Sequence, residues 1–526
     1  MKHSKRFIIA VILSMSLFVT ACSSGSNGAG SVTNEPSQTN APSQTNAPET
    51  EEPIEITINP STWFIPTNDG NEIQKYLEKK HNVKIVNMRA TSENFKVKVA
   101  AGDIPDIFPQ DVNEGDMINY ARQGVIASIS IDEIRQYMPT YVADVEAIDP
   151  NAWDIGLYDG KNWGIPRVWL NGQYGFIPTY NSAWLKAIGY NEAPKTLEEY
   201  EDVVYKFRNN DPDGNDKKDT YAFTSRGTGN QQFNEIYAAH GVNPYQFMLA
   251  ADGSVTWGGL SDQAKEALKL LQKWYKDGVI DPEFLTDNND TITQKWNNKK
   301  IGIIDYKMYH HLYGQIDTDK ENGIEAAYGK GLIGPAGKPI LMSNGAKQVP
   351  LLLGAQVEKD EKKRIKILQI LEDLVSNDET YLTTAFGIEG VSYELQDGAA
   401  VALEPYKSDV NKANELGYGG YYNPLGERSL TMWKYHFTPE KLAFRDTLNE
   451  GSELISDILG PTPLEARAKY SATLNPLQDE YYVKAIIGTD DIDKTFEEFK
   501  QNWLRSGGKE LLEEATKVYQ ERQSAK

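Results

Sequence analysis

The stretch from residue 54 to residue 111 decides the fold class, because segments with strand and helix periodicity alternate along it. It reads IEITI (54–58), NEIQKYLEKKHNVKIVNMRA (71–90) and SENFKVKVAAGDIPDIFPQD (92–111). The first segment alternates like a strand, the second is an amphipathic helix followed by a strand, and the third is a helix followed by the apolar strand IPDIF. This order predicts a parallel sheet with helices on its faces, which is an α/β fold.

The residues directly after these strands are candidates for ligand binding. In open parallel sheets, ligands collect beyond the carboxyl ends of the strands. Trp63 follows the first strand, and Gln110 and Asp111 follow the third. We therefore predict that these three side chains line a pocket.

The same alternation continues along the rest of the chain. Amphipathic helices are predicted over 194–210 and 261–277, and apolar strands over 301–304 and 348–357. Thr196 and Glu199 form a T-x-x-E capping box at the start of the first of these helices. Strands interleaved over so long a chain favour two α/β lobes, and no solenoid-type repeat is present.

The N-terminal residues predict export and a lipid anchor. Lys2, Lys5 and Arg6 precede the short apolar run IIAVILSMSLFV, which leads into Val19-Thr20-Ala21-Cys22. This is the pattern of a signal peptide over 1–21 with a lipobox, in which Cys22 receives the lipid. The alternative is an ordinary secretory signal with a cysteine nearby by chance. Residues 22–53 are rich in Ser, Asn, Thr and Pro, which predicts a disordered, lipidated tether.

Composition excludes several classes of function. Cys22 is the only cysteine of the 526 residues, so the folded part has none for disulfides, metal ligation or nucleophilic chemistry. The net charge of −21 leaves no basic surface for nucleic acid. The chain contains 29 Tyr and 10 Trp, and aromatic faces are the surfaces against which sugar rings pack.

The stretch DPDGNDKKD (211–219) predicts a calcium loop. Oxygen-bearing side chains or a backbone carbonyl fall at alternate positions, as in a helix–loop calcium pattern, and the candidate ligands are Asp211, Asp213, Asn215, Lys217 and Asp219. Asp216 stands where such loops carry Gly, and Ala222 stands where they carry a bidentate Glu, so a sensor role is disfavoured. The alternative is a solvated acidic turn. We expect a structural calcium ion.

Several of these segments occur together, and in order, in one known family. AAGDIPDIF, GKNWGIP, AWLKAIGY, APKTLEEY, DPDGNDKKD and WYKDGVIDPEF follow the lipobox and tether. The chain thereby resembles the extracellular solute-binding lipoproteins of carbohydrate ABC importers, in family 1. It is most similar to the alginate-binding proteins and the LplA-like lipoproteins of Gram-positive bacteria.

The resemblance implies a two-lobed periplasmic-binding-protein-like fold of type II, with lobes joined by hinge strands. It places the N-terminal lobe at 54–176 and 343–392, and the C-terminal lobe at 177–342 and 393–526. Chain crossings are expected near 175–180, 340–345 and 390–395. It also implies Thr220 as an additional calcium ligand, since relatives often carry Glu there.

The implied function is the capture of an oligosaccharide between the lobes and its delivery to an ABC permease. The expected protein is a monomer on the outer face of the cell membrane, attached through its lipid (palmitate) anchor alone. Besides Trp63, Gln110 and Asp111, the predicted ligand-binding residues are Arg167, Trp169, Arg226, Tyr309 and Trp433. Arg226 is suited to the carboxylate of a uronic-acid sugar, although such an arginine is more often a surface residue.

The competing class is a cell-surface glycoside hydrolase or lyase. The 75 acidic residues always offer some pair of carboxylates, so the sequence leaves this alternative open. No G-x-S-x-G motif is present, and the six histidines show no H-E-x-x-H spacing. We predict no catalytic residues.

Overall fold

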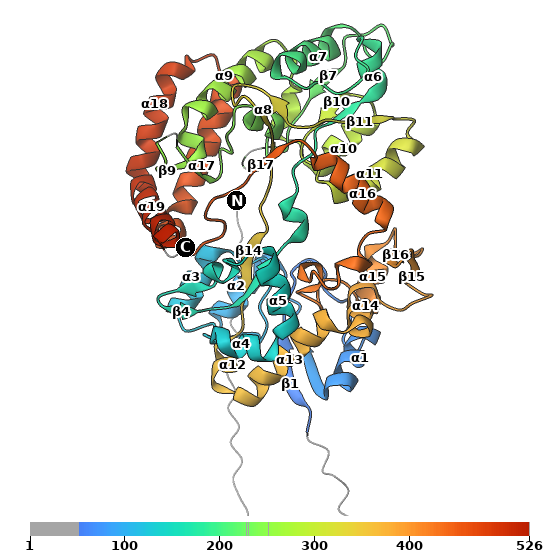
Figure 1. Ribbon diagram of the computed structural model, residues 1–526, viewed down its shortest axis with the longest axis vertical. Coiled ribbons are helices and arrows are strands. Elements are labelled where there is room, and N and C mark those ends of the chain that lie inside the picture. The colour runs from blue at the N-terminus through green and yellow to red at the C-terminus, as the bar shows by residue number, and fades with distance from the viewer. Residues whose placement is uncertain (1–51, 228, 230, 251, 525–526) are drawn as a thin grey trace, which may run out of the picture. The chain divides into compact units, whose positions relative to one another are not determined.

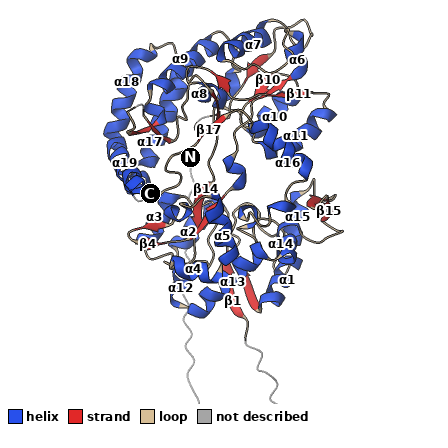
Figure 2. Cartoon of the chain, viewed as in Figure 1, coloured by secondary structure: helices blue, strands red, loops and turns tan. Residues whose placement is uncertain are grey.

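The computed structural model describes residues 52–227, 229, 231–250 and 252–524. The predicted leader, Cys22 and the tether up to residue 51 lie outside the described residues. Residues 52 onward form one compact unit. It is built of short strands and many helices, as Figure 2 shows.

The first lobe is built on the predicted alternation. β1 (Ile54–Ile58) and β2 (Val83–Asn87) pair in parallel with Ile54 opposite Val83. The predicted strand IPDIF contributes only a bridge at Ile107, which links Ile58 to Leu353. Pro105 has no N–H to donate, which limits pairing along this segment.

The other elements of this lobe come from two separate parts of the chain (Figure 1). They are α1 (Glu72–His81), α2 (Ser92–Ala100), α3 (Glu114–Arg122), α4 (Ile131–Tyr137), α5 (Pro139–Ile148), η1 (Ala152–Ile155), β3 (Leu157–Tyr158), β4 (Lys161–Asn162), β5 (Ile165–Val168), β14 (Lys347–Leu351), α12 (Ala355–Lys359), α13 (Glu361–Ser376), α14 (Asp378–Phe386), β15 (Tyr393–Gln396), β16 (Ala399–Ala402), α15 (Val410–Leu416), η5 (Gly426–Arg428) and η6 (Trp433–Tyr435).

The second lobe contains a mixed sheet in the order β11-β6-β10-β7. β10 runs parallel to β7 and antiparallel to β6. The elements of this lobe are β6 (Thr179–Asn181), α6 (Ser182–Ala187), α7 (Leu197–Asn209), β7 (Tyr221–Phe223), α8 (Asn234–Ala239), β8 (Phe247–Leu249), β9 (Val255–Trp257), η3 (Gly258–Leu260), α9 (Asp262–Lys276), η4 (Pro282–Leu285), α10 (Asn289–Asn297), β10 (Ile301–Ile304), α11 (Tyr309–Glu321), β11 (Ala326–Tyr328), β12 (Leu332–Ile333), β13 (Pro339–Met342), α16 (Pro439–Asn449), β17 (Glu453–Ile455), α17 (Glu465–Ile487), α18 (Ile492–Trp503), η7 (Leu504–Gly508) and α19 (Lys509–Ser524).

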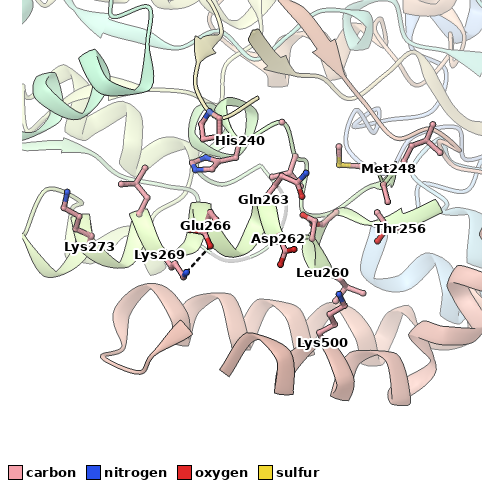
Figure 3. A pocket seen from close by; sticks show the side chains of 18 residues that line it. His240, Met248, Thr256, Leu260, Asp262, Gln263, Glu266, Lys269, Lys273 and Lys500 are labelled. Carbon is pink, nitrogen blue, oxygen red and sulfur yellow. Dashed lines mark hydrogen bonds and ion pairs between the residues drawn. The ribbon is translucent and has the colours of Figure 1, made fainter. Parts of the chain in front are cut away.

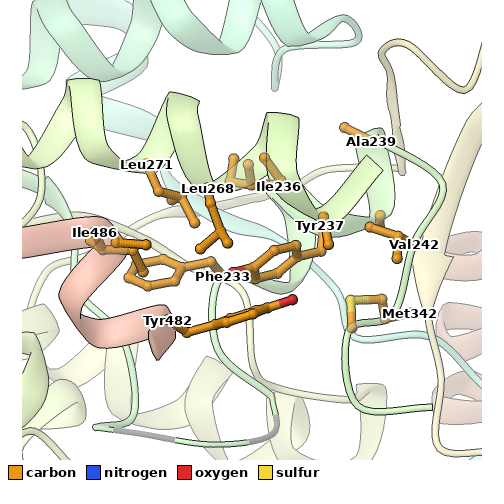
Figure 4. Packing of buried hydrophobic residues seen from close by; sticks show 14 of the residues in the cluster. Phe233, Ile236, Tyr237, Ala239, Val242, Leu268, Leu271, Met342, Tyr482 and Ile486 are labelled. Atoms are coloured by element: carbon orange, nitrogen blue, oxygen red, sulfur yellow. The ribbon is translucent and has the colours of Figure 1, made fainter. Parts of the chain in front are cut away.

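The core of the second lobe joins α8, α9 and α17. Figure 4 shows Tyr237 of α8 over Tyr482 of α17, and their ring centroids are 6.2 Å apart. Leu268 and Leu271 of α9 are fully buried on the same cluster. Aliphatic side chains at i and i+3 on one face of α9 explain why this helix docks there.

The segments that cross between lobes lie next to each other. η2 (Leu170–Gln173) follows β5, and Gly175 pairs with Ser343 ahead of β14. The third crossing differs from the predicted one near 390–395, because Tyr421, Tyr422 and Leu425 are buried in the core of the first lobe with Ile56. These aromatic and leucine side chains hold residues 393–425 on the first lobe, and the chain returns to the second lobe only with α16.

None of the helices in the described part of the chain is long and apolar enough to cross a membrane.

Candidate functional site

A cavity of about 500 Å³ opens on the first lobe beside the crossing segments. Its walls come from the segment that follows β1, from β5 and β14, from the last turn of α14 and from the segment that follows α14. The lining residues are Trp63, Phe64, Gln110, Asp111, Arg167, Trp169, Gln348, Ala385, Phe386, Gly419, Gly420, Asn423, Gly426, Arg428 and His436.

The structure brings together five of the predicted ligand-binding residues in this cavity. They are Trp63, Gln110, Asp111, Arg167 and Trp169. Trp63, Gln110 and Asp111 follow first-lobe strand segments, where the rule that ligands collect at the carboxyl ends of parallel strands places them. Arg167 lies within β5 and Trp169 directly follows it, and these two are predicted from the family resemblance.

Aromatic side chains form one wall of the cavity. Trp63 and Phe64 are 70% and 42% exposed, although large apolar side chains usually bury themselves. Trp169 lies edge-on to His310 of the second lobe, with ring centroids 5.8 Å apart. Exposed aromatic faces at a cavity suit the flat, apolar faces of a sugar ring.

The polar floor of the cavity is formed by two arginines and one glutamine. Arg167 is buried and donates to the Gln110 carbonyl at 2.8 Å and to Gln348 Oε1 at 3.2 Å. Arg428 donates to the same Gln348 oxygen at 3.2 and 3.0 Å. Burial, and then the neighbouring charge of Arg428, lower the pKa of Arg167 to about 9.

Asp111 is the acidic residue among those that line the cavity. Its carboxylate accepts from the Thr62 hydroxyl at 2.6 Å and from the Ser92 hydroxyl at 3.3 Å. The buried Gln110 Oε1 has no hydrogen-bond partner among the described residues. A hydroxyl-rich ligand therefore meets acceptors as well as donors at this cavity.

Three predicted ligand-binding residues do not line the cavity. Tyr309 is fully buried, donates its hydroxyl to Asn171, and packs edge-on against Tyr174. Arg226 contacts Gln231 and the ring of Tyr306. These are packing positions in the second lobe, and aromatic or cationic residue type alone does not distinguish them from binding positions.

Trp433 lies behind the cavity. Its ring stacks on His436 at 5.2 Å, and His436 is the residue that lines the wall. Trp433 therefore supports a wall residue.

Sequence reasoning missed Gln348, Phe386, Asn423, Arg428 and His436. The segment GYGGYYNPLGER (417–428) carried a usable signal, because its glycines permit a close backbone approach. Gly420, for example, lies against the side chains of Gln110 and Phe64.

The predicted calcium loop joins α7 to β7, and its oxygens converge. Asn215 Nδ2 donates to Asp213 Oδ2 at 2.8 Å and to Asp219 Oδ1 at 3.1 Å. Asp213 Oδ1 is buried without a hydrogen-bond partner among the described residues. Burial, followed by the nearby Asp211 and Asp219, raises the pKa of Asp213.

These donors fit calcium in chemistry but are not already arranged as a shell. Backbone N–H groups of Asn215 and Asp216 point at the Asp211 carboxylate, and no described group of three or more acidic, His or Cys side chains is arranged as a metal site. The Thr220 hydroxyl donates to the Phe207 carbonyl at 2.8 Å, so it serves to anchor the end of α7.

A larger cavity of about 880 Å³ lies on the second lobe between α9, β9 and α18 (Figure 3). None of the predicted residues lines it. Lys269 on its wall pairs with Glu266 at 3.0 Å, as the dashed line in Figure 3 shows. The first-lobe cavity, with its exposed aromatics and shared arginine floor, is the better candidate site.

The chain has two α/β lobes, and a cavity lined by aromatic and arginine side chains lies beside the segments that cross between them. This arrangement is typical of two-lobed binding proteins. The family model for bacterial extracellular solute-binding proteins matches residues 72–349. The chain belongs to this family, which confirms the predicted fold class and the prediction of a solute-binding protein.

Relatives of known identity agree with this assignment. The chain is 23% identical to lipoprotein LipO of Bacillus subtilis over 85% of this chain and 88% of the relative. It is 28% identical to the fructooligosaccharide ABC transporter substrate-binding protein FusA of Streptococcus pneumoniae over 53% of each chain.

Solved structures show the same fold. FusA of Streptococcus pneumoniae in complex with kestose gives a TM-score of 0.69 at 19% identity, over 90% of this chain and 100% of that chain. The alginate-binding protein AlgQ2, solved without calcium ion, gives 0.66 at 19% identity over 90% and 99%. An EF-hand mutant of FusA has also been solved.

Proposed function

We propose that this protein is a lipid-anchored extracellular receptor that captures an oligosaccharide and delivers it to an ABC import permease. The observation that carries the proposal is the exposed Trp63 and Phe64 beside the arginine floor of the cavity. Membership of a solute-binding family, and oligosaccharide-binding relatives such as FusA, support it.

Binding is proposed to work by closure of the two lobes. The cavity walls belong to the first lobe, and Trp169 extends to His310 of the second lobe at the crossing segments. A sugar bound against Trp63 and Trp169 gains contacts with the second lobe only when the lobes approach. The ligand therefore favours the closed state by its differential affinity for it.

The test is to titrate the full-length protein, purified in detergent, with plant and microbial oligosaccharides. We expect saturable calorimetric binding of at least one sugar, recovered intact by chromatography afterwards. Cleaved products would support the alternative, a carbohydrate-active enzyme, and contradict a receptor. Absence of binding across the panel would contradict an oligosaccharide ligand.

A structural calcium ion in the loop after α7 is a second part of the proposal. Asp211, Asp213, Asn215 and Asp219, with the Lys217 carbonyl, would hold it, and when bound it would neutralise the converging carboxylates. Removing calcium with a chelator is expected to lower the unfolding temperature, and adding calcium back is expected to restore it. An unchanged unfolding temperature, with no calcium in the native mass spectrum, would contradict this.

Anchoring through Cys22 is the third part. Cells fed a labelled palmitate analogue are expected to label the wild-type chain and not the Cys22→Ala variant. We further propose that the receptor acts as a monomer on the outer face of the membrane. Permease partners would be identified by crosslinking on cells.

A further inference from the structure

The cavity floor concentrates positive charge in an otherwise acidic protein. The chain carries a net charge of −21, yet the charged side chains that line the cavity, among those that the structure describes, are Arg167, Arg428 and a single acid, Asp111. No carboxylate among the described side chains forms an ion pair with either arginine. A buried, incompletely paired guanidinium is unfavourable unless something compensates it.

Both arginines direct their donors to one neutral oxygen. Gln348 Oε1 accepts from Arg167 and from Arg428, at distances of 3.0 to 3.2 Å. The Arg167 Nε is buried and has no hydrogen-bond partner among the described residues. Like charges thus face each other across an amide, and an N–H donor stays unused.

The local charges do not neutralise this arrangement. An arginine keeps its proton in a protein, so the lowered pKa of Arg167 reports a charge that its surroundings compensate poorly. Asp111 acts on Arg167 through its charge alone, and the hydrogen bonds that its carboxylate accepts come from Thr62 and Ser92, both at Oδ2. The missing partner is a planar anion with two acceptor oxygens.

We propose that the sugar bound at this cavity carries a carboxylate, which lies against Arg167 and Arg428, so that the receptor takes uronate-type acidic oligosaccharides. This inference rests on the proposed function and narrows it. Trp63 and Phe64 provide the stacking surface for the sugar ring, and the two arginines bind its carboxylate. We therefore assign the carboxylate contact, which the sequence suggests for Arg226, to Arg167 and Arg428 of the first lobe.

The test compares acidic sugars with matched neutral ones on the full-length protein. The probes are trisaccharides of galacturonic, glucuronic, mannuronic and guluronic acid, each beside its carboxyl-reduced counterpart. We expect at least one acidic trisaccharide to bind about tenfold or more tightly than its neutral counterpart, since charge-assisted hydrogen bonds are lost on reduction. Affinity is also expected to fall as salt is raised.

A matched pair of variants identifies the residues. Arg428→Gln is expected to weaken binding of the acidic sugar about 10- to 100-fold and to reduce its salt dependence. Arg135→Gln removes a partly exposed arginine that pairs with Glu146 outside the cavity, and is expected to leave binding unchanged. The wild-type comparison of acid and neutral sugars stands even where a variant folds poorly.

The outcomes separate this inference from the proposed function. A neutral sugar that binds while its acidic counterpart does not, equal binding of the two, or equal effects of the two variants would overturn the acidic ligand and leave a sugar receptor. Failure of all acidic and neutral sugars to bind would overturn both.

Discussion

At the scale of single residues, exposure separates binding positions from packing positions better than residue type does. Trp63 and Tyr309 are both aromatic residues that we predict to bind the ligand from the sequence. Trp63 is 70% exposed at the cavity, whereas Tyr309 is fully buried with its hydroxyl on Asn171. The first side chain is available to a ligand, and the second contributes to the folded state.

Substitution of these two residues is expected to give opposite results. Trp63→Ala should weaken sugar binding by ~1–2 kcal/mol through lost stacking, with unfolding unchanged within about 0.5 kcal/mol. Tyr309→Phe should lower the unfolding free energy by about 1 kcal/mol, by removing one hydrogen bond, and leave affinity unchanged. Calorimetry and urea unfolding measure both. Loss of affinity in Tyr309→Phe alone would contradict the assignment.

At the scale of elements, the end of β10 and the start of α8 place an acid in an unfavourable environment. Asp305 follows β10 and accepts from the backbone N–H of Glu235 at 3.2 Å. Burial raises its pKa to about 6, and Glu235, Tyr180 and Tyr200 crowd the same region while Arg226 offsets part of the cost. The folded state therefore holds this proton more tightly than the unfolded state does.

This predicts a pH-dependent effect of Asp305→Asn. Because the folded-state pKa lies above the ordinary value of 3.8, the contribution of Asp305 to stability falls as pH rises from about 4 to about 6. The neutral Asn avoids that loss, so the variant should be more stable than wild type by about 3 kcal/mol above pH 6 and equal to it below pH 4. Urea unfolding across this pH range measures the difference. The matched exposed variant Asp252→Asn should show no such gain, since hydrogen bonds from Ser254 lower the pKa of Asp252.

Elements with strong local signals were predictable from the sequence. Thr196 Oγ1 accepts from the Glu199 N–H at 3.1 Å, so the cap of α7 is where the T-x-x-E motif predicts it. The Glu199 carboxylate, however, accepts from the backbone N–H of Lys195, whereas a capping box requires it to accept from the backbone N–H of Thr196. Gln348 and Arg428 could not be predicted, because Gln348 meets Arg167, and Arg428 meets Gln348, only through contacts between distant segments. Periodicity locates elements but does not report which distant loops they bring together.

At the scale of the whole molecule, the two lobes meet through closely packed crossing segments. Trp169 N donates to the Ala346 carbonyl at 2.7 Å, directly after β5 and ahead of β14. A Cβ on Gly172 would lie 2.2 Å from the Gly345 carbonyl oxygen. We expect motion of one lobe against the other to pass through this contact. Arg467 of α17 pairs with Glu114 of α3 at 2.9 Å and also links the lobes.

A methyl group at the crossing should affect the whole molecule. Gly172→Ala is expected to force the two segments apart, lowering the unfolding free energy by about 1–3 kcal/mol and reducing the sugar-induced decrease in radius of gyration measured by X-ray scattering. Gly314→Ala is the control, since a Cβ there meets nothing within 4 Å in helix α11 and should stabilise by about 0.5–1 kcal/mol. Normal closure in Gly172→Ala would show that the joint lies elsewhere.

The shared oxygen of Gln348 has a consequence for how receptors of this kind diversify. A change from Gln to Glu requires one base substitution and would place a carboxylate between Arg167 and Arg428, which both already direct donors to that position. The protein would then supply internally the anion that we assign to the sugar. One mutation would thus convert a receptor for acidic sugars into one for neutral sugars, and the reverse mutation would restore the original preference. The ligand specificity of such a receptor could therefore change between acidic and neutral sugars without any remodelling of the fold.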